Sequence, residues 1–122
     1  MSNISGVVAR VFVDDLDAAI PLYQQLAQTT AVNRFGFRDV QLAQVGPFLL
    51  LSGGTARYRD RVATILVRHL PPVSAAIQAA GGRILEGPAP APNGDRLIAR
   101  HPDGAVFEYI ETGDQRQVDQ HW

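Results

Sequence analysis

The chain has 122 residues, 46% of them hydrophobic, which is enough for one domain with a packed core and too few for two independent domains. Its formal net charge of −1 provides no basic surface for nucleic acid, and the absence of cysteine excludes disulfides, a thiolate nucleophile and a cysteine-ligated metal. Neither a signal peptide nor an apolar run of membrane-spanning length is found, so we expect a cytoplasmic protein without a membrane partner.

The first half of the chain predicts a strand, a helix and three further strands. Residues 7–13 are apolar and rich in valine apart from Arg10, which is typical of a strand. The acidic run 14–17 supplies an N-cap and first-turn carboxylates, and apolar residues then recur at helical spacing over 18–27. Pro21 fits only if this helix begins near residue 18 or is locally distorted. A β-meander of short extended segments follows, at 32–38, 40–45 and 48–52.

The second half repeats this order. The polar, arginine-rich segment 54–61 has no periodicity and is predicted to be a flexible linker between the halves. Residues 62–68 predict a strand, and a helix then runs from Pro71-Pro72 to residue 80, where Gly81-Gly82 ends it. Extended segments complete the repeat, at 83–86, 95–100 and 105–111.

The repeat predicts an α+β fold made of two packed βαβββ modules in a single domain, 1–122. The first module covers about 5–53 and the second about 62–112, with a polar tail at 113–122. Residues 87–94 are too rich in proline to pair as a central strand and are expected to form a loop. Each helix should cover the apolar face of its own sheet, which leaves the opposite, concave face open to other uses.

The last predicted strand carries a carboxylate that is unusual for its position. Pro102-Asp103-Gly104 is a turn sequence, and strict alternation after it places Glu108 on the same face as Val106 and Ile110. A lone Glu on a strand is normally solvated. Because the repeat turns this face inward, Glu108 becomes the candidate functional carboxylate of the chain.

Several of these segments together resemble the vicinal oxygen chelate superfamily, which includes glyoxalases, bleomycin-resistance proteins, fosfomycin-resistance enzymes and extradiol dioxygenases. The resemblance covers the chain from about residue 7 to residue 111. It implies that the two βαβββ modules form a cup-shaped mixed sheet and that two cups occur in a homodimer. It rests on Val11-Phe12-Val13-Asp14-Asp15-Leu16, on Ile20-Pro21-Leu22-Tyr23, on the helix end at Gly81-Gly82, and on His101-Pro102-Asp103-Gly104-Ala105-Val106-Phe107-Glu108.

Enzymes of this family hold a divalent metal with His, Gln or Glu side chains from four cup strands. Carried over to this chain, the four positions fall on Val8, Leu50, Val62 and Glu108. Only Glu108 has a donor atom, and a cation needs several protein ligands to compete with water, so the resemblance implies no metal and no cofactor. Further ligands could come only from His69, His101 or His121, for which a surface or turn histidine is the simpler interpretation; the role of Trp122 beside His121 is not assigned.

Alternation predicts an apolar cup face that carries one Arg, one Thr and one Glu, a composition typical of a small-molecule site. If the cup is instead filled by its own side chains, Arg10 and Glu108 should pair, because a buried charge without a partner is costly. An Arg10–Glu108 pair is compatible both with a cup that is open to a ligand and with a cup that is filled by its own side chains. The predicted cup face consists of Val8, Arg10, Phe12, Phe48, Leu50, Val62, Thr64, Leu66, Val106, Glu108 and Ile110, and all but Val8 and Val62 are candidate ligand-binding residues.

Three functions compete at this point. The first is metal-free binding of an aromatic or natural-product-like small molecule, as in the bleomycin-resistance branch, with resistance by sequestration and stacking on Phe12, Phe35, Phe37, Phe48 and Trp122. The second is a metal-dependent glyoxalase- or dioxygenase-like enzyme that uses Glu108 as a metal ligand or general base. The third is a degenerate, closed module kept for dimerisation or regulation. The loss of donor atoms at the metal positions argues against an enzyme.

Overall fold

The computed structural model describes residues 2–113, and its elements follow the predicted order twice. The first module contains β1 (Ile4–Phe12), α1 (Leu16–Ala27), β2 (Asn33–Phe37), β3 (Val40–Val45) and β4 (Phe48–Gly53). A 3₁₀ turn, η1 (Ala56–Tyr58), leads into the second module, which contains β5 (Arg61–Val67), α2 (Leu70–Ala79), β6 (Arg83–Ala89), β7 (Asp95–Arg100) and β8 (Val106–Glu111). The predicted α+β fold of two βαβββ modules is confirmed.

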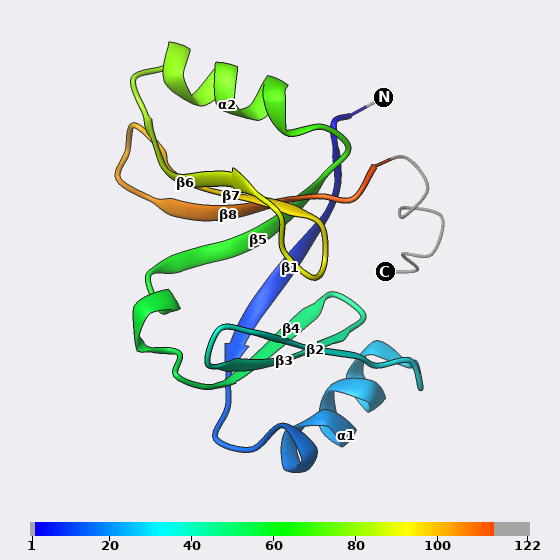
Figure 1. Cartoon of the computed structure of the whole chain (residues 1–122). Helices are drawn as coiled ribbons and strands as arrows, with labels where there is room; N and C mark the ends of the chain where they lie inside the picture. Colours follow the sequence, from blue (N-terminus) through cyan, green and yellow to red (C-terminus); the bar gives the residue numbers. More distant parts are fainter. Residues whose placement is uncertain (1, 114–122) are drawn as a thin grey trace.

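The eight strands form one mixed sheet in the order β2-β3-β4-β1-β5-β8-β7-β6. At its centre β1 and β5 pair antiparallel, with Val8 opposite Thr64, so the two modules join within one chain (Figure 1). In each module the first and last strands pair in parallel, β1 with β4 and β5 with β8. This arrangement brings the first strand of the chain and its last strand to either side of β5.

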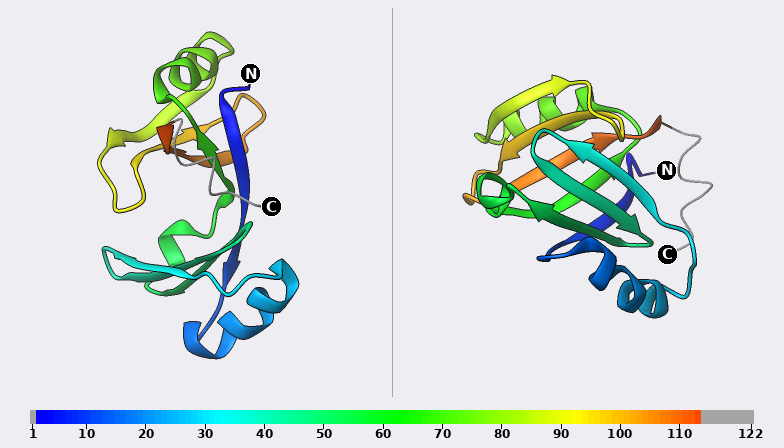
Figure 2. Two further views of the ribbon diagram at one scale, coloured as in Figure 1. Left: turned by 90° about the vertical axis from the view of Figure 1, so that its right-hand side faces the viewer. Right: turned by 60° about the horizontal axis from the view of Figure 1, so that its bottom comes forward.

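The two helices cover the outer faces of the two halves of the sheet (Figures 1 and 2). Leu16 and Ile20 of α1 pack against Ala43, Val45 and Leu50 behind β3 and β4. The second helix packs in the same way behind the second module, where Leu70 and Ile77 join a cluster with side chains of β5, β7 and β8. A third cluster contains residues of both modules and lies on the inner face of the sheet.

The first helix begins earlier than its sequence predicts. Asp15 is its N-cap, and the Asp15 carboxylate accepts a hydrogen bond from the backbone N–H of Asp17 at 3.0 Å. The helix therefore starts at Leu16 and contains Pro21, which is exposed. Burial of Leu16 and Ile20 on the opposite face accounts for helix formation across a residue that normally disfavours it.

The predicted loop 87–94 is partly a strand, because β6 continues to Ala89. Ala89 pairs with Arg96 of β7 after irregularities in the register. β6 lies at the edge of the sheet, where Pro88 removes no hydrogen bond to a further strand.

The segment 54–61 is more than a linker, since it contains η1 and the side chain of Tyr58, which is only 4% exposed. Within residues 2–113 no helix is long and apolar enough to cross a membrane. The histidine and tryptophan at positions 121 and 122 lie outside the described residues.

Candidate functional site

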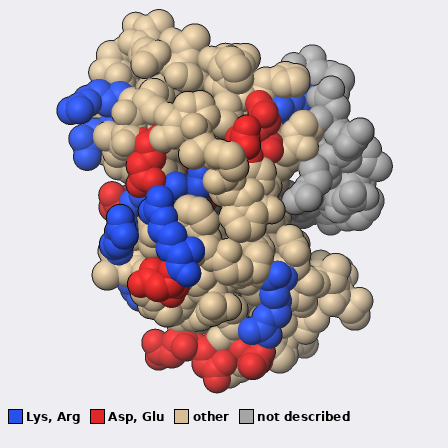
Figure 3. All heavy atoms as spheres, viewed as in Figure 1, with Lys and Arg blue, Asp and Glu red and all other residues tan. Residues whose placement is uncertain are grey.

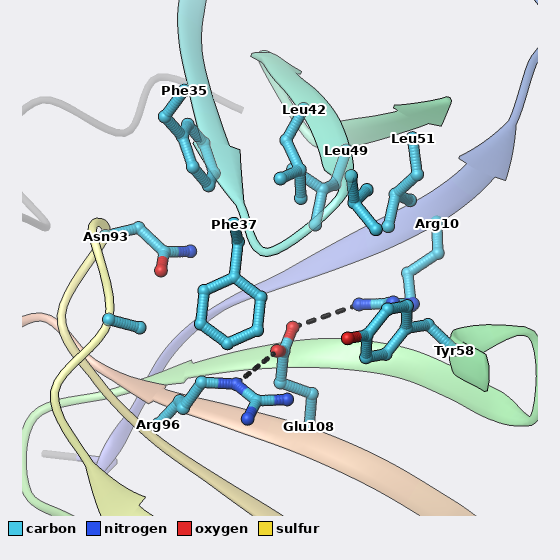
Figure 4. A pocket seen from close by; sticks show the side chains of 12 residues that line it. Arg10, Phe35, Phe37, Leu42, Leu49, Leu51, Tyr58, Asn93, Arg96 and Glu108 are labelled. Carbon is cyan, nitrogen blue, oxygen red and sulfur yellow. Dashed lines mark hydrogen bonds and ion pairs between the residues drawn. The ribbon is translucent and has the colours of Figure 1, made fainter. Parts of the chain in front are cut away.

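A cavity lies between the two modules on the inner side of the sheet (Figure 4). The space between its side chains, counted together with the open solvent at its mouth, is about 400 Å³. One wall comes from β2, β3 and β4, the other from β7, β8 and the loop between β6 and β7, with β1 and η1 completing it. The lining residues are Arg10, Phe35, Phe37, Val40, Leu42, Leu49, Leu51, Tyr58, Ala91, Asn93, Arg96 and Glu108.

The wall from the first module is apolar. Phe35, Leu42 and Leu51 lie side by side across β2, β3 and β4, because Phe35 is paired with Leu42 and Leu42 with Leu51. Paired residues on neighbouring strands face the same side of a sheet, so these three form one continuous surface. The partly buried rings of Phe35 and Phe37 pack against this cluster and can stack on a planar ligand.

Glu108 holds together a charged network on the opposite side of the cavity. Arg10 Nη1 donates to Glu108 Oε1 at 2.9 Å and to Thr64 Oγ1 at 2.7 Å, and Thr64 Oγ1 donates to the same Glu108 oxygen at 2.7 Å. Arg96 Nε donates to Glu108 Oε2 at 3.3 Å. The side chains of Arg10, Arg96 and Glu108 are 4%, 6% and 13% exposed. Both oxygens of Glu108 therefore serve to hold two buried guanidinium groups (Figure 4).

Burial is the largest influence on the pKa of Arg10 and lowers it. The charge of Glu108 and its hydrogen bond raise this pKa, whereas the neighbouring Arg61 and Arg96 lower it, and the net direction is downward. Arg10 Nε is buried and has no hydrogen-bond partner among the described residues. Glu108 thus compensates the buried charge of Arg10 only in part.

A second carboxylate, Glu86, lies at the outer side of the same network. Glu86 Oε1 accepts a hydrogen bond from Arg96 Nη1 at 3.0 Å, and Arg38 and Arg61 approach the carboxylate at 3.5 and 3.6 Å. Burial raises the pKa of Glu86, but the hydrogen bond and charge of Arg96, with the charges of Arg38 and Arg61, lower it more. Figure 3 shows basic and acidic side chains next to each other on the surface at the level between the modules.

Arginines also cover the aromatic rings near the mouth of the cavity. The guanidinium carbons of Arg38 and Arg96 lie 4.8 and 4.7 Å from the centre of the Phe37 ring, within cation–π range. Arg38 Nη1 donates a hydrogen bond to the hydroxyl of Tyr58 at 3.2 Å. These contacts connect the β2–β3 hairpin to the second module across the mouth.

Several residues predicted for the cup face are where alternation places them. Arg10 and Glu108 line the cavity and form the predicted pair, and Thr64 lies directly behind them. Phe12, Leu66 and Ile110 belong to the core cluster on the inner face without lining the cavity, and Val106 is buried outside it. Whether any of these residues binds a ligand stays a prediction.

The placement of Phe48 and Leu50 on the cup face is wrong. Phe48 packs edge-on against Tyr23 of α1, with ring centres 4.9 Å apart, and Leu50 is buried against the same helix. The inner face of β4 carries Leu49 and Leu51, because Leu49 pairs with Arg10 of β1. The inward positions of β4 cannot be placed by analogy with β8, because the β3–β4 connection is shorter than the β7–β8 connection and a shift of one residue exchanges the faces of a strand.

The placement of Val62 on the cup face is also wrong, since this side chain is 60% exposed. The pairing of β5 with β8 is irregular between Arg61 and Thr64, as expected of a β-bulge. Arg61 is the buried side chain at this point of the strand, with 8% exposure, and it approaches Glu86.

Eight lining residues were not among those predicted from the sequence: Val40, Leu42, Leu49, Leu51, Tyr58, Ala91, Asn93 and Arg96. The polar ones are Tyr58, Asn93 and Arg96. Tyr58 is the only aromatic residue of the polar segment 54–61, which is a signal that this segment reaches the core. Arg96 lies two residues before Ile98 on β7, so alternation places both on one face. Asn93 lies in a loop, and no periodic pattern points to it.

Neither of the two histidines within residues 2–113 contacts Glu108. His69 is the N-cap residue of α2. His101 stacks on Phe107, with ring centres 4.4 Å apart, and its Nε2 lies 2.6 Å from the hydroxyl of Tyr109, whose pKa is raised by burial. Phe107 and Tyr109 alternate with Glu108 along β8, so His101 is on the opposite face of the sheet.

The residues around Glu108 do not fit a divalent cation. Both carboxylate oxygens are bonded to guanidinium groups, which repel a cation, and Val8, the other family position on the inner face, is apolar. Within residues 2–113 no group of three or more His, Cys, Asp or Glu side chains could hold a metal ion. The chemistry of this donor set instead favours an anionic or hydrogen-bond-accepting group.

The sequence matches no family model and no curated protein. The structure resembles that of an uncharacterized protein from Methanosarcina mazei, with a TM-score of 0.84 and 33% identity over 90% of this chain and 94% of that one. The chain therefore belongs to the same family as that protein, whose description gives no function.

More distant structures include methylmalonyl-CoA epimerase from Mycobacterium tuberculosis, with a TM-score of 0.68 and 18% identity over 97% of this chain and 95% of that one. A variant of the Streptomyces coelicolor methylmalonyl-CoA epimerase in complex with 2-nitronate-propionyl-CoA gives a TM-score of 0.66 and 15% identity over 93% of this chain and 99% of that one. At these identities the likeness shows a shared fold.

Proposed function

We propose that this chain, which has the fold of the vicinal oxygen chelate superfamily, is a binding protein that holds an aromatic or natural-product-like small molecule in its cup without a metal. The observation that carries the proposal is the cavity between the modules, with an apolar wall on one side and hydrogen-bonding groups on the other. Such a combination gives a ligand both contact area and orientation.

The Streptomyces coelicolor epimerase variant is in complex with 2-nitronate-propionyl-CoA, but we propose binding rather than catalysis for this chain. Glu108 is the carboxylate that lines the cavity, and its oxygens already accept hydrogen bonds from Arg10, Thr64 and Arg96. A general base needs a free lone pair within reach of the proton that it removes. The network therefore supports a role for Glu108 in holding the arginines in place.

A protein that binds without chemistry acts by retaining its ligand, so we further propose sequestration, with resistance to a natural product as one use. We also propose a homodimer. Ile4 and Val7 of β1 and Val62 of β5 are 49%, 53% and 60% exposed, and a partner could cover these apolar side chains. Analytical ultracentrifugation tests the dimer, and a monomer at all concentrations contradicts it.

Titration of the purified protein with a panel of small aromatic compounds tests binding, with thermal unfolding and calorimetry as readouts. Affinities should be the same after treatment with EDTA and after addition of Ni²⁺, Mn²⁺ or Zn²⁺. Stoichiometric metal that raises affinity and is lost in the Glu108→Gln variant would overturn the metal-free proposal.

A matched pair of variants locates the site. Phe35 lines the cavity on the inner face, whereas Phe48 packs on the outer face against Tyr23, and both are partly buried. Phe35→Ala should weaken binding by about tenfold, from loss of aromatic contact area. Phe48→Ala should lower stability and leave the affinity of the remaining folded protein unchanged. Equal effects of both substitutions on affinity contradict a ligand site in the cavity.

A further inference from the structure

The charged groups that line the cavity do not balance. They are the guanidinium groups of Arg10 and Arg96 and the carboxylate of Glu108, so the lining retains one net positive charge. The next layer does not remove this excess. Glu86 bonds to Arg96 at 3.0 Å, but it is shared with Arg38 and Arg61, and Asp60, which pairs with Arg61, is mostly exposed. Even with both of these carboxylates counted, four arginines face three carboxylates. An uncompensated buried charge is unfavourable, and a bound anion would neutralise it.

Hydrogen-bond donors also exceed acceptors around the cavity. Arg10 bonds through Nη1 alone and Arg96 through Nε and Nη1, so neither Nη2 group has a partner within residues 2–113. The hydroxyl of Tyr58 accepts from Arg38 and keeps its own proton to donate. The amide of Asn93 makes no side-chain hydrogen bond to the described residues, and Figure 4 shows it on the far side of Phe37 from Tyr58.

We infer that the ligand of this cup is an organic monocarboxylate, whose acid group binds Arg10 and Arg96 beside Tyr58 and whose apolar body lies on the wall of β2–β4. This inference rests on the proposed binding function and names its ligand class. A single carboxylate matches the one uncompensated positive charge, and its planar geometry matches the fork of donors on an arginine. A phosphate monoester carries nearly twice that charge at neutral pH and fits the lining less well.

Glu108 is a positioning residue in this arrangement. Its two oxygens fix the side chains of Arg10 and Arg96 on either side, so the donors that remain are oriented before a ligand enters. Groups held in place in this way lose less conformational entropy on binding.

The experiment is a titration with matched pairs that differ only at the acid group. Suitable pairs are 3-phenylpropionate with 3-phenylpropionamide, indole-3-acetate with indole-3-acetamide, and 4-methylpentanoate with its amide, with phenyl phosphate as a dianionic comparison. Each acid should bind at least about tenfold more tightly than its amide, as expected for a charge-assisted hydrogen bond. Amides that bind as tightly as acids, or tighter binding of phenyl phosphate, overturn the inference and leave the binding function intact. Absence of binding by every compound overturns the proposed function together with this inference.

Variants test the assignment to these residues through the ratio of acid affinity to amide affinity, which general damage to the site would not change. Arg96→Gln should reduce the ratio by about tenfold and Arg96→Lys by less, since lysine keeps the charge. Arg100→Gln removes an exposed arginine from the same strand outside the cavity and should leave the ratio unchanged.

A milder variant covers the case in which Arg96→Gln does not fold. Tyr58→Phe keeps every charge and should lower acid affinity by about threefold to tenfold, with a smaller effect on the amide. An acid-to-amide ratio that is the same in Tyr58→Phe as in the unmodified chain contradicts the site.

Discussion

Arg10 and Glu108 are 98 positions apart in the sequence, yet Arg10 Nη1 lies 2.9 Å from Glu108 Oε1. The contact joins the first strand of the first module to the last strand of the second across β5, and Thr64 of β5 bonds to both side chains. These three side chains form one polar cluster to which both modules contribute. The pair therefore contributes both to the assembly of the modules and to the shape of the cavity.

Glu108→Gln should lower the free energy of unfolding by about 3 kcal/mol, because it leaves two largely buried guanidinium groups without their shared counter-charge. Urea unfolding at pH 7 measures this loss. In the double variant Arg10→Gln/Glu108→Gln the destabilisation should be smaller than the sum for the two single variants, since no charge of the pair is then left alone. Additive effects would show that the two side chains are not coupled.

Gly53 and Gly104 offer a comparison in which one backbone conformation occurs in two environments. Their φ angles are +92° and +94°, but a Cβ atom on Gly53 would lie 2.7 Å from the backbone carbonyl oxygen of Asp39, whereas nothing lies within 4 Å of one on Gly104. Gly104→Ala should cost about 1–2 kcal/mol from the left-handed conformation alone. Gly53→Ala should cost at least about 1 kcal/mol more, because the backbone of the β2–β3 hairpin must also move. Chemical denaturation of both variants checks the difference, and equal losses contradict the packing argument.

The architecture can be predicted from the sequence because each strand and helix of the repeat has a recognisable local pattern of apolar residues and end signals. Valine-rich strands, Asp15 before the first helix and Gly81 after the second are local signals, and they lead to the correct order of elements. The same reasoning pairs Arg10 with Glu108, since both lie on inner faces and neither charge could be buried alone.

The residues that were assigned to the wrong face, and those that were not predicted at all, have a different explanation. Phe48, Leu50 and Val62 fail because the face of a strand depends on its register, which the short β3–β4 connection and the irregularity after Arg61 determine. Arg96 and Tyr58 were not found because their burial depends on partners from other strands and from η1. Such tertiary contacts leave little trace in local periodicity.

Glu86 should make stability depend on acid pH. Its pKa is lowered in the folded protein from the ordinary value of 4.5, with burial opposing and Arg96, Arg38 and Arg61 producing the shift. A lowered folded-state pKa means that the stabilisation is fully present above pH 4.5 and is lost as the pH falls through the folded-state value. The stability difference between the unmodified chain and Glu86→Gln should therefore shrink between pH 5 and pH 3. Asp95→Asn, at an exposed position outside the cavity, is the control for loss of one carboxylate.

Arg38 combines a strained backbone with contacts across the mouth of the cavity. Its φ of +56° is left-handed, which Asn tolerates better than other residues with a side chain, and its guanidinium group reaches Tyr58 and Glu86. Arg38→Asn and Arg38→Ala both remove these contacts. The Arg38→Ala variant should nevertheless be less stable than Arg38→Asn by about 0.5–1 kcal/mol, because alanine adopts the left-handed backbone conformation less readily than asparagine. The lost ion pair itself, on a side chain that is 41% exposed, should contribute little to global stability.

The effect of the contacts should appear locally instead. Without Arg38 the tip of the β2–β3 hairpin loses its hydrogen bond to Tyr58 and its ion pair with Glu86. Amide hydrogens at the tip, from Phe37 to Val40, should therefore exchange several-fold faster in Arg38→Asn than in the unmodified chain. Exchange in α2, which Arg38 does not contact, provides the reference in the same sample. Faster exchange in both elements would indicate general destabilisation. An unchanged rate at the hairpin would show that the contacts of Arg38 do not hold the hairpin tip in place across the mouth of the cavity.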